Sequence, residues 1–512
     1  MSVVPHLQPA VTRRELYLVF AGLMLALTLA SLDQNIVSTA LPRIVSDLGG
    51  LAHLSWVVTA FMVTSTVSTP LYGKLSDMYG RKPLFFVAIT IFLIGSVVCG
   101  MAETMFQLII FRALQGLGAG GLITLAQTTV GDLIAPRDRG KYQGLFGAVF
   151  ATCSVAGPLL GGLITDALSW RWIFYVNLPV GAAALVLIAI GLRTHCRNVR
   201  HRIDYTGAAF MSSGTVALLL LLSWGGSVYP WTSPMILTLA VVAAIFYTLL
   251  VWQEGRANEP ILPLHLFRNP VFVVAVSVIG LNAMALFGSL VFLPLFFQLV
   301  LGASASKAGL MMAPMMGGVI VASVTGGRLV SRFGRYKIFP VIGLVVATGS
   351  FLLLAYAATY RSSTMLVESA LVGLGAGLGL VMPNLTVAIQ NAVDRRDLGV
   401  ATSVSGFIRS LGGALGVAVA GTVVAMRLRH FLHGTAADPD ATAGNILQLG
   451  VQQISSLPEE QRDLLQLAYR HAVAMTFLTG AAVAALAFTV VLFLPERPLR
   501  ASIPDTAPAG DA

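Results

Sequence analysis

The sequence contains few charged residues and few cysteines. Asp, Glu, Lys and Arg make up 11% of its 512 residues, whereas about 25% is usual in a soluble domain. This scarcity excludes a soluble enzyme and a disordered protein. The three cysteines, Cys99, Cys153 and Cys196, form no close pair and no metal-binding spacing, which excludes a secreted disulfide scaffold. We expect all three to be reduced and structural.

Signatures of bound cofactors are scarce as well. The eight histidines form no cluster that could hold a metal. No Gly-x4-Gly-Lys-Ser/Thr segment occurs, so we expect neither a nucleotide nor any other cofactor. No cleavable signal peptide is visible: Arg13 and Arg14 precede a long apolar run, which we interpret as a first span that is retained.

Apolar residues dominate the chain instead. They make up 56% of it, and 51 glycines accompany them, as expected where helices pack closely in a membrane. Roughly 20 apolar residues cross a bilayer, so we predict an all-α polytopic membrane protein with fourteen transmembrane helices. The fourteen apolar runs are 16–40, 53–73, 83–102, 106–130, 141–165, 171–192, 204–224, 233–252, 271–299, 306–327, 338–359, 365–389, 399–426 and 471–494.

The net charge of +10 reports the orientation of the chain and not a nucleic-acid partner. Of the 32 Lys and Arg residues, 22 lie in loops on the side where the chain starts and 8 lie on the opposite side. Such a bias places the first side in the cytoplasm, so we expect both termini there, with the chain in a cell (inner) membrane. Arg outnumbers Lys by 27 to 5, which indicates a bacterial source.

Segments of the first half recur in the second half in the same order and eight spans later. Because the repeats are separated by an even number of spans, both copies run in the same direction through the membrane. The sequence therefore predicts two parallel six-helix bundles with the seventh and eighth spans inserted between them. In such an architecture the substrate site lies between halves that rock. The recurring pairs are 113–120 with 370–377, 137–140 with 396–399, and 73–81 with 327–335. The predicted parts are a cytoplasmic N-terminus (1–15), the first bundle (16–192), two linking helices (204–252), the second bundle (271–494) with an outer loop (427–470), and a cytoplasmic tail (495–512).

The most specific motif is Gly-Lys-Leu-Ser-Asp-Met-Tyr-Gly-Arg-Lys at residues 73–82, between the second and third spans. Glycines suit a sharp turn, and Asp77 at a helix end can cap backbone amides or meet an arginine. The segment resembles the signature loop of the major facilitator superfamily. It departs from that pattern at Met78, often a basic residue in the family, and in its second copy, where Ser331 replaces the acid. The resemblance implies a conformational switch made by Gly73, Asp77, Gly80, Arg81 and Lys82.

Three further segments narrow the resemblance. Residues 32–42 (LDQNIVSTALP) resemble the first-helix motif of the fourteen-helix drug:proton antiporters (EmrB/QacA-like), and Arg112 with Gln115 is similar to the superfamily's fourth-helix arginine motif. Residues 157–162 resemble the antiporter motif, with Cys153 where a further glycine is usual. The resemblance implies a major facilitator fold and export. It also implies a hinge or seal at Gly157, Pro158, Gly161 and Gly162.

Asp33 and Arg112 are predicted to lie at the same depth in the membrane. Asp33 is about seven residues from the outer end of its span, or roughly 10 Å, and Arg112 is about six residues from the same face, or roughly 9 Å. An acid inside the bilayer is costly and marks a functional site. We interpret Asp33 as a proton-binding residue that Arg112 tunes. The alternative is a static buried pair that orders the bundle.

Other polar residues in or near the spans are candidates to line a substrate cavity. For Arg409, a structural role and binding of an anionic substrate group are open alternatives. Asp132 and Asp204 are interpreted as helix-end caps, and Asp132 is a candidate to join the network of Asp77. The cavity candidates are Gln34, Asn35, Gln115, Asn282, Gln298, Asn384 and Arg409.

The sequence therefore predicts a secondary active exporter that exchanges protons inward for lipophilic small molecules outward. Its expected partners are the substrate, protons and the lipid bilayer, with no nucleic acid and no nucleotide, and we expect a monomer. The alternative is a dedicated exporter of one native metabolite, lipid or siderophore on the same fold. A membrane sensor or enzyme is a remote alternative, since no soluble output domain and no nucleophile–base cluster is visible.

Overall fold

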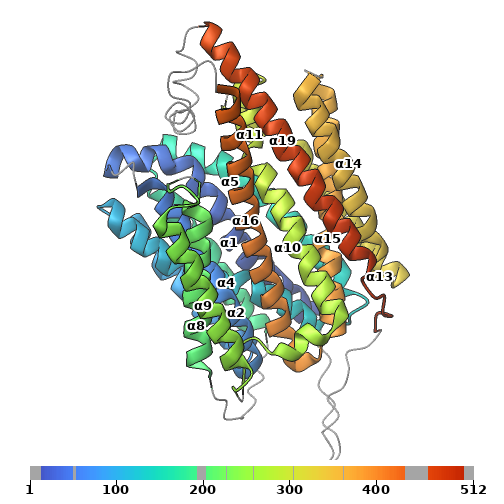
Figure 1. Cartoon of the computed structure of the whole chain (residues 1–512). Coiled ribbons are helices and arrows are strands. Elements are labelled where there is room, and N and C mark those ends of the chain that lie inside the picture. Colours follow the sequence, from blue (N-terminus) through green and yellow to red (C-terminus); the bar gives the residue numbers. More distant parts are fainter. Residues whose placement is uncertain are drawn as a thin grey trace, which may run out of the picture.

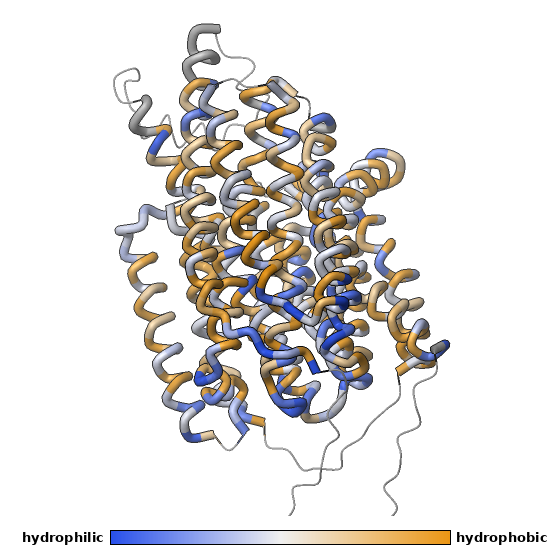
Figure 2. The backbone as a smooth tube through the Cα atoms, turned by 90° about the vertical axis from the view of Figure 1, so that its right-hand side faces the viewer, coloured by the Kyte–Doolittle hydropathy of each residue, from blue (hydrophilic) through white to orange (hydrophobic). Residues whose placement is uncertain are grey.

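The computed structural model describes residues 13–49, 53–192, 203–226, 228–257, 259–303, 305–360, 363–432 and 459–500. Within these ranges the protein is helical, and thirteen helices are long and apolar enough to cross a membrane. Most of the helices run lengthwise through the molecule, at different tilts (Figure 1). The middle parts of the helices are mostly apolar, and polar residues gather at the lower end of the bundle (Figure 2). The chain is therefore a multi-pass membrane protein.

The helices follow the predicted order of spans. The first half contains α1 (Arg13–Leu48), α2 (Leu54–Tyr79), α3 (Arg81–Gly100), α4 (Met105–Leu133), α5 (Arg139–Ala167), α6 (Trp172–Tyr175) and α7 (Asn177–Gly191). The inserted helices are α8 (Tyr205–Trp224) and α9 (Pro234–Glu254). The second half contains η2 (Leu264–Arg268), α10 (Pro270–Leu290), α11 (Leu293–Leu299), α12 (Ala305–Leu310), α13 (Ala313–Phe333), α14 (Ile338–Tyr360), α15 (Thr364–Ala392), η3 (Arg395–Asp397), α16 (Leu398–Leu432) and α19 (Glu459–Leu492).

The helix bundle has two ends, the Arg81 end and the Asp47 end. The Arg81 end carries the start of α1 and the α2–α3, α4–α5 and α15–α16 connections. The Asp47 end is the opposite one, where α1 leads to α2. The Arg81 end is the one that the loop charges predict to be cytoplasmic.

The structure differs from the predicted spans in three details. Three predicted spans are interrupted, at the α6–α7, α10–α11 and α12–α13 junctions. In each case the first turn of the following helix contains a proline, which lacks the backbone amide donor that a continuous helix needs. These prolines are Pro179, Pro294 and Pro314. The thirteen helices do not include α2, which covers the predicted second span. Within the predicted outer loop 427–470, α16 continues to Leu432 and α19 starts at Glu459, whereas residues 433–458 lie outside the described residues.

The two halves meet along two pairs of helices. α2 of the first half packs against α16 of the second, and α5 packs against α13. The inserted helix α8 packs against α9 and contacts both α2 and α16, so the inserted pair lies beside the first of these joints (Figure 1). Each half has its own apolar core, built around Phe85 and Phe92 in the first and around Phe351 and Phe477 in the second. Ala151 of α5 is part of the second core, so α5 reaches across the joint.

Candidate functional sites

Asp33 lies at the centre of a buried polar network inside the first half. Arg112 of α4 donates to Asp33 Oδ2 at 2.6 Å. Gln115 and Asn177 each donate to Asp33 Oδ1 at 2.8 Å. The side chain of Asp33 has no exposed area in this conformation, and Arg112 is 1% exposed. The predicted meeting of Asp33 and Arg112 therefore occurs, and the pair is closed off from solvent.

Arg112 has partners other than Asp33. Its Nη1 donates to Gln115 Oε1 at 2.8 Å, and its Nε lies 3.4 Å from the carbonyl oxygen of Val57. Its guanidinium also stacks over the ring of Phe61 at 4.1 Å, a cation–π contact that favours the charged arginine. Arg112 therefore keeps other partners when the charge of Asp33 is neutralised.

Asn177 and Ser96 belong to this network but were not predicted from the sequence. Ser96 Oγ accepts from Asn177 at 3.0 Å and from Gln115 at 3.2 Å, and it donates to the carbonyl oxygen of Phe174 at 2.8 Å. Asn177 starts α7 directly after the break in the predicted sixth span. Single neutral polar residues are common in apolar runs, so no sequence signal singled out Asn177 or Ser96.

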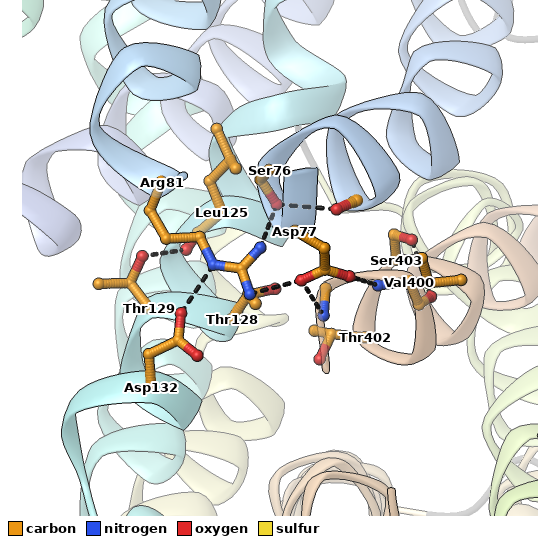
Figure 3. Close-up of polar contacts among 12 residues, drawn as sticks. Ser76, Asp77, Arg81, Leu125, Thr128, Thr129, Asp132, Val400, Thr402 and Ser403 are labelled. Carbon is orange, nitrogen blue, oxygen red and sulfur yellow. Dashed lines mark hydrogen bonds and ion pairs between the residues drawn. The ribbon is translucent and has the colours of Figure 1, made fainter. Parts of the chain in front are cut away.

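Asp77 joins the two halves at the Arg81 end (Figure 3). Its carboxylate oxygens accept hydrogen bonds from the backbone N–H groups of Gly399 at 3.0 Å and Val400 at 2.8 Å. These first amides of α16 lack partners within the helix and carry the positive end of its dipole. Arg81 pairs with Asp77 at 2.6 Å and with Asp132 of α4 at 2.7 Å. The predicted participation of Asp132 is thereby observed.

A second joint at the Arg81 end has the opposite polarity. Arg139 at the start of α5 donates to the carbonyl oxygens of Gly131 and Ile134 at the end of α4. It also donates to the carbonyl oxygen of Gln390 near the end of α15, at 3.0 Å, and Gln390 returns a hydrogen bond to the carbonyl oxygen of Gln127 at 3.1 Å. A cation at helix C-termini is favourable. Arg139 therefore ties the first half to the second, and we did not predict this from the sequence.

Ser331 takes the position in the second half that Asp77 takes in the first. A Cβ built on Gly140, at the start of α5, would lie 3.2 Å from Ser331 Oγ and 2.5 Å from the carbonyl oxygen of Gly327. Arg137 Nε lies 3.4 Å from the carbonyl oxygen of Ser331. The repeated loop therefore meets α5 as the Asp77 loop meets α16, but with a neutral hydroxyl.

The other predicted switch residues have local roles at the same end. Gly80 has φ 90°, in the left-handed region that favours glycine, and turns the chain from α2 into α3. Lys82 donates to the carbonyl oxygen of Ala189 at 2.7 Å, near the end of α7. A side chain at Gly73 would collide with Ser403 of α16, so the close approach of α2 and α16 requires this glycine.

The predicted hinge residues bring α5 against α1. A Cβ on Gly157 would lie 2.6 Å from Asn35 Cβ, and one on Gly161 would lie 2.6 Å from the carbonyl oxygen of Ile36. Pro158 lies inside α5. Gly162 has open space beside it and lines a cavity of about 500 Å³ between α1 and α5 at the Asp47 end. This helix pair is therefore tight around residues 157–161 and open beyond them.

The remaining cavity candidates do not form one cluster in this conformation. Gln34 is exposed on α1, whereas Gln298 and Arg409 are half-buried. Asn282 and Asn384 are each 1% exposed, and both amide atoms of Asn282 and the Oδ1 atom of Asn384 have no partner in the described part of the chain. Only Gln115 among the candidates contacts Asp33, so a shared substrate cavity for the set stays a prediction.

We expect the joint at Asp77 to strengthen as the pH falls. Burial raises the pKa of Asp77 to about 6, and the Arg81 guanidinium and the Val400 amide offset only part of this effect. In this structure Asp77 is buried where the two halves meet, and we call this arrangement of the Arg81 end closed. Because the pKa of Asp77 is raised there, the closed arrangement binds a proton more tightly than one in which Asp77 is solvated. The closed arrangement is therefore more stable below about pH 6 than above it. Spin labels on the exposed residues Lys141 and Arg396 should report more of the short, closed distance at about pH 5 than at about pH 8.

Asp77→Asn should remove this pH dependence, whereas Glu496→Gln, a change at an exposed acid near the same end, should preserve it. The labels require a background without Cys99, Cys153 and Cys196. An unchanged pH shift in the Asp77→Asn protein would show that another group titrates.

Known proteins resemble this chain over most of its length. A family model described as the Major Facilitator Superfamily matches residues 23–203 and 206–417. The multidrug transporter protein MdtP of Bacillus subtilis is 42% identical over 415 residues, which cover 81% of this chain and 76% of that protein. Multidrug resistance protein 3 of the same bacterium is 36% identical over 487 residues, which cover 93% and 94%. The human organic anion transporter MFSD10 has a TM-score of 0.61 at 16% identity, covering 94% of this chain and 100% of that one, a likeness of fold alone.

Proposed function

Because the chain belongs to the major facilitator superfamily, and resembles its drug efflux transporters, we propose that it exports lipophilic small molecules in exchange for protons. Relatives named as a multidrug transporter, at 42% identity, and as a multidrug resistance protein, at 36% identity, support the efflux function. The observation that supports proton coupling is the buried network of Asp33, since a carboxylate inside the bilayer with an arginine partner is costly to keep without a function.

In the proposed cycle, residues 16–192 and 271–494 are the halves that rock. The hydrogen bonds of Asp77 and Arg139 hold the Arg81 end closed in this structure. If the Arg81 end is cytoplasmic, as the loop charges predict, this conformation is closed to the cytoplasm. The opposite conformation would break these bonds and open the same end to substrate.

Protonation of Asp33 is the proposed coupling step. A proton on Oδ2 would replace the hydrogen bond from Arg112, which then keeps Gln115, Val57 and Phe61 as partners. Since Asp33 has no exposed area here, the proton can reach it only after the network opens. We therefore propose that proton exchange accompanies the movement of α1 against α4, and that substrate and proton use the site in alternation.

A transport assay in proteoliposomes tests this function. Ethidium serves as a lipophilic probe, with a panel of neutral lipophilic dyes beside it. We expect uphill probe transport only when a proton gradient is imposed, and an uncoupler should abolish it. Transport that ignores the gradient would contradict proton coupling, and transport of a single compound in the panel would favour the dedicated exporter instead.

A further inference from the structure

The inserted helices α8 and α9 carry a pair of acidic side chains that the proposed transport cycle does not use. Asp204 caps the start of α8 and Glu254 is the last residue of α9. Asp204 Oδ1 accepts from the backbone of Gly207 at 2.8 Å and from Gln253 Nε2 at 3.1 Å. Glu254 Oε2 accepts from the backbone of Leu262 at 3.1 Å. One oxygen of each carboxyl group is therefore held in place by donors.

The backbone of Ile261 also contributes to holding the Glu254 carboxyl group. Even so, the second oxygen of each acid lacks a hydrogen-bond partner that meets distance and angle limits in the described part of the chain. Asp204 Oδ2 and Glu254 Oε1 are both buried and have no hydrogen-bond partner among the described residues. Glu254 is 4% exposed. Both oxygens face the same glycine: a methyl group built on Gly207 would lie 2.5 Å from Asp204 Oδ2 and 3.3 Å from Glu254 Oε1. A buried carboxylate oxygen without a partner is costly, and two neighbouring negative charges repel each other.

The surrounding charges leave the pair with an excess of negative charge. Lys74 of α2 and Asp204 are the charged side chains that act on Glu254, the first favouring its negative charge and the second opposing it. Arg256, in the following loop, stacks its guanidinium on the ring of Trp252 at 3.9 Å. Lys74 therefore acts on Glu254 against the negative charge of Asp204.

We propose that Asp204 and Glu254 form a proton-binding site, separate from Asp33, and that the two carboxyl groups bind one proton. Glu254 carries the proton, and its Oε1–H donates to Asp204 Oδ2, so a single hydrogen bond satisfies both unpartnered oxygens. Asp204 is the acceptor in this bond, and its other oxygen already accepts two hydrogen bonds at the N-terminal end of α8. The proton is taken from water and returned to water.

Such a site would couple pH at the Arg81 end to the inserted helices. Glu254 also holds Leu262, in the segment that leads from α9 to the second half. Loss of the proton would place two negative charges over Gly207 and push the end of α9 away from the start of α8. The α8–α9 contact at this end should therefore loosen as the pH rises.

Glu254→Gln is the informative substitution, because glutamine mimics the protonated acid. Its oxygen can accept from Leu262, and its amide can donate to Asp204 Oδ2. We expect the melting temperatures of wild type and variant in detergent to coincide at about pH 5. As the pH rises to about 9, we expect the wild type to fall progressively below the variant. Infrared spectra at neutral pH should show a protonated carboxyl band in the wild type that Glu254→Gln removes.

Two further variants keep the test specific. Asp33→Asn should retain the carboxyl band, which separates this proposal from the proton-coupling role of Asp33. Glu496→Gln, at an exposed acid, should retain both the band and the pH-dependent melting. The proposal would be overturned if the melting temperatures of wild type and Glu254→Gln changed with pH in the same way. It would also be overturned if Glu254→Gln removed only an ionised carboxylate band from the infrared spectrum. A sodium- or potassium-dependent melting temperature lost in Glu254→Gln would also overturn it, in favour of a bound cation.

Discussion

Asp33→Asn should reduce gradient-driven export in proteoliposomes to the background leak. The substituted side chain has nearly the size of the aspartate but cannot exchange a proton, so substrate movement loses its coupling. Leaving Arg112 buried without its anion costs about 3–5 kcal/mol in other proteins. We expect less here, because Arg112 keeps Gln115 and the ring of Phe61 as partners. The protein should therefore still fold, with a lower melting temperature.

Two variants distinguish a coupling role from a structural one. Glu368→Gln neutralises an acid in α15 of the other half, outside the network, and should leave gradient-driven export near the wild-type rate. Asp33→Glu keeps the exchangeable proton and should retain part of the export. If folded Asp33→Asn protein transports ethidium uphill with unchanged dependence on the proton gradient, Asp33 is the static buried pair that the sequence left open as an alternative.

Gly327→Val should prevent closure at the Arg81 end and abolish transport. A Cβ at Gly327 would clash with the carbonyl oxygen of Gly140 across the α5–α13 joint, and backbone cannot move aside as a flexible side chain can. Spin labels on Lys141 and Arg396 should then lose the short distance of the closed end, while the helices of each half stay folded. The joints of Asp77 and Arg139 should open with it, because they lie at the same end.

Gly317→Val is the matched control for this change. It lies ten residues earlier on α13, and a Cβ there meets nothing within 4 Å. The same valine on the same helix should therefore leave both the label distance and the transport rate near wild type. Equal loss in both variants would mean that α13 tolerates no valine, and closed distances in the Gly327→Val protein would show that this joint does not control closure.

Hydropathy and repeat spacing were sufficient to predict most of the fold. Apolar runs fix where helices cross the membrane, and the recurrence of 113–120 as 370–377 predicted that the two halves run parallel. The breaks within three spans were missed, because a window of mean hydropathy does not register a proline in the first turn of a following helix. The apolar run 53–73 corresponds to α2, and the signature loop follows it directly.

In the candidate site, only the charged residues whose depth in the membrane could be estimated from the sequence were predictable. Asp33 and Arg112 stood out because ions are rare inside a span. Their equal depth predicted that they could meet, and in the structure they lie 2.6 Å apart. Neutral partners such as Asn177 and Ser96 carry no such signal, since single polar residues in spans are common. Arg139 was overlooked because its contacts are backbone carbonyls of two other helices, which only the folded chain brings together.

Proton release on substrate binding tests the central role of Asp33 most directly. Purified protein in weakly buffered detergent should release about one proton per bound ethidium molecule if substrate and proton use the site of Asp33 in alternation. The account predicts this release in the wild type and in Glu254→Gln, and none in Asp33→Asn protein that still binds ethidium. Equal release from wild type and Asp33→Asn would contradict it.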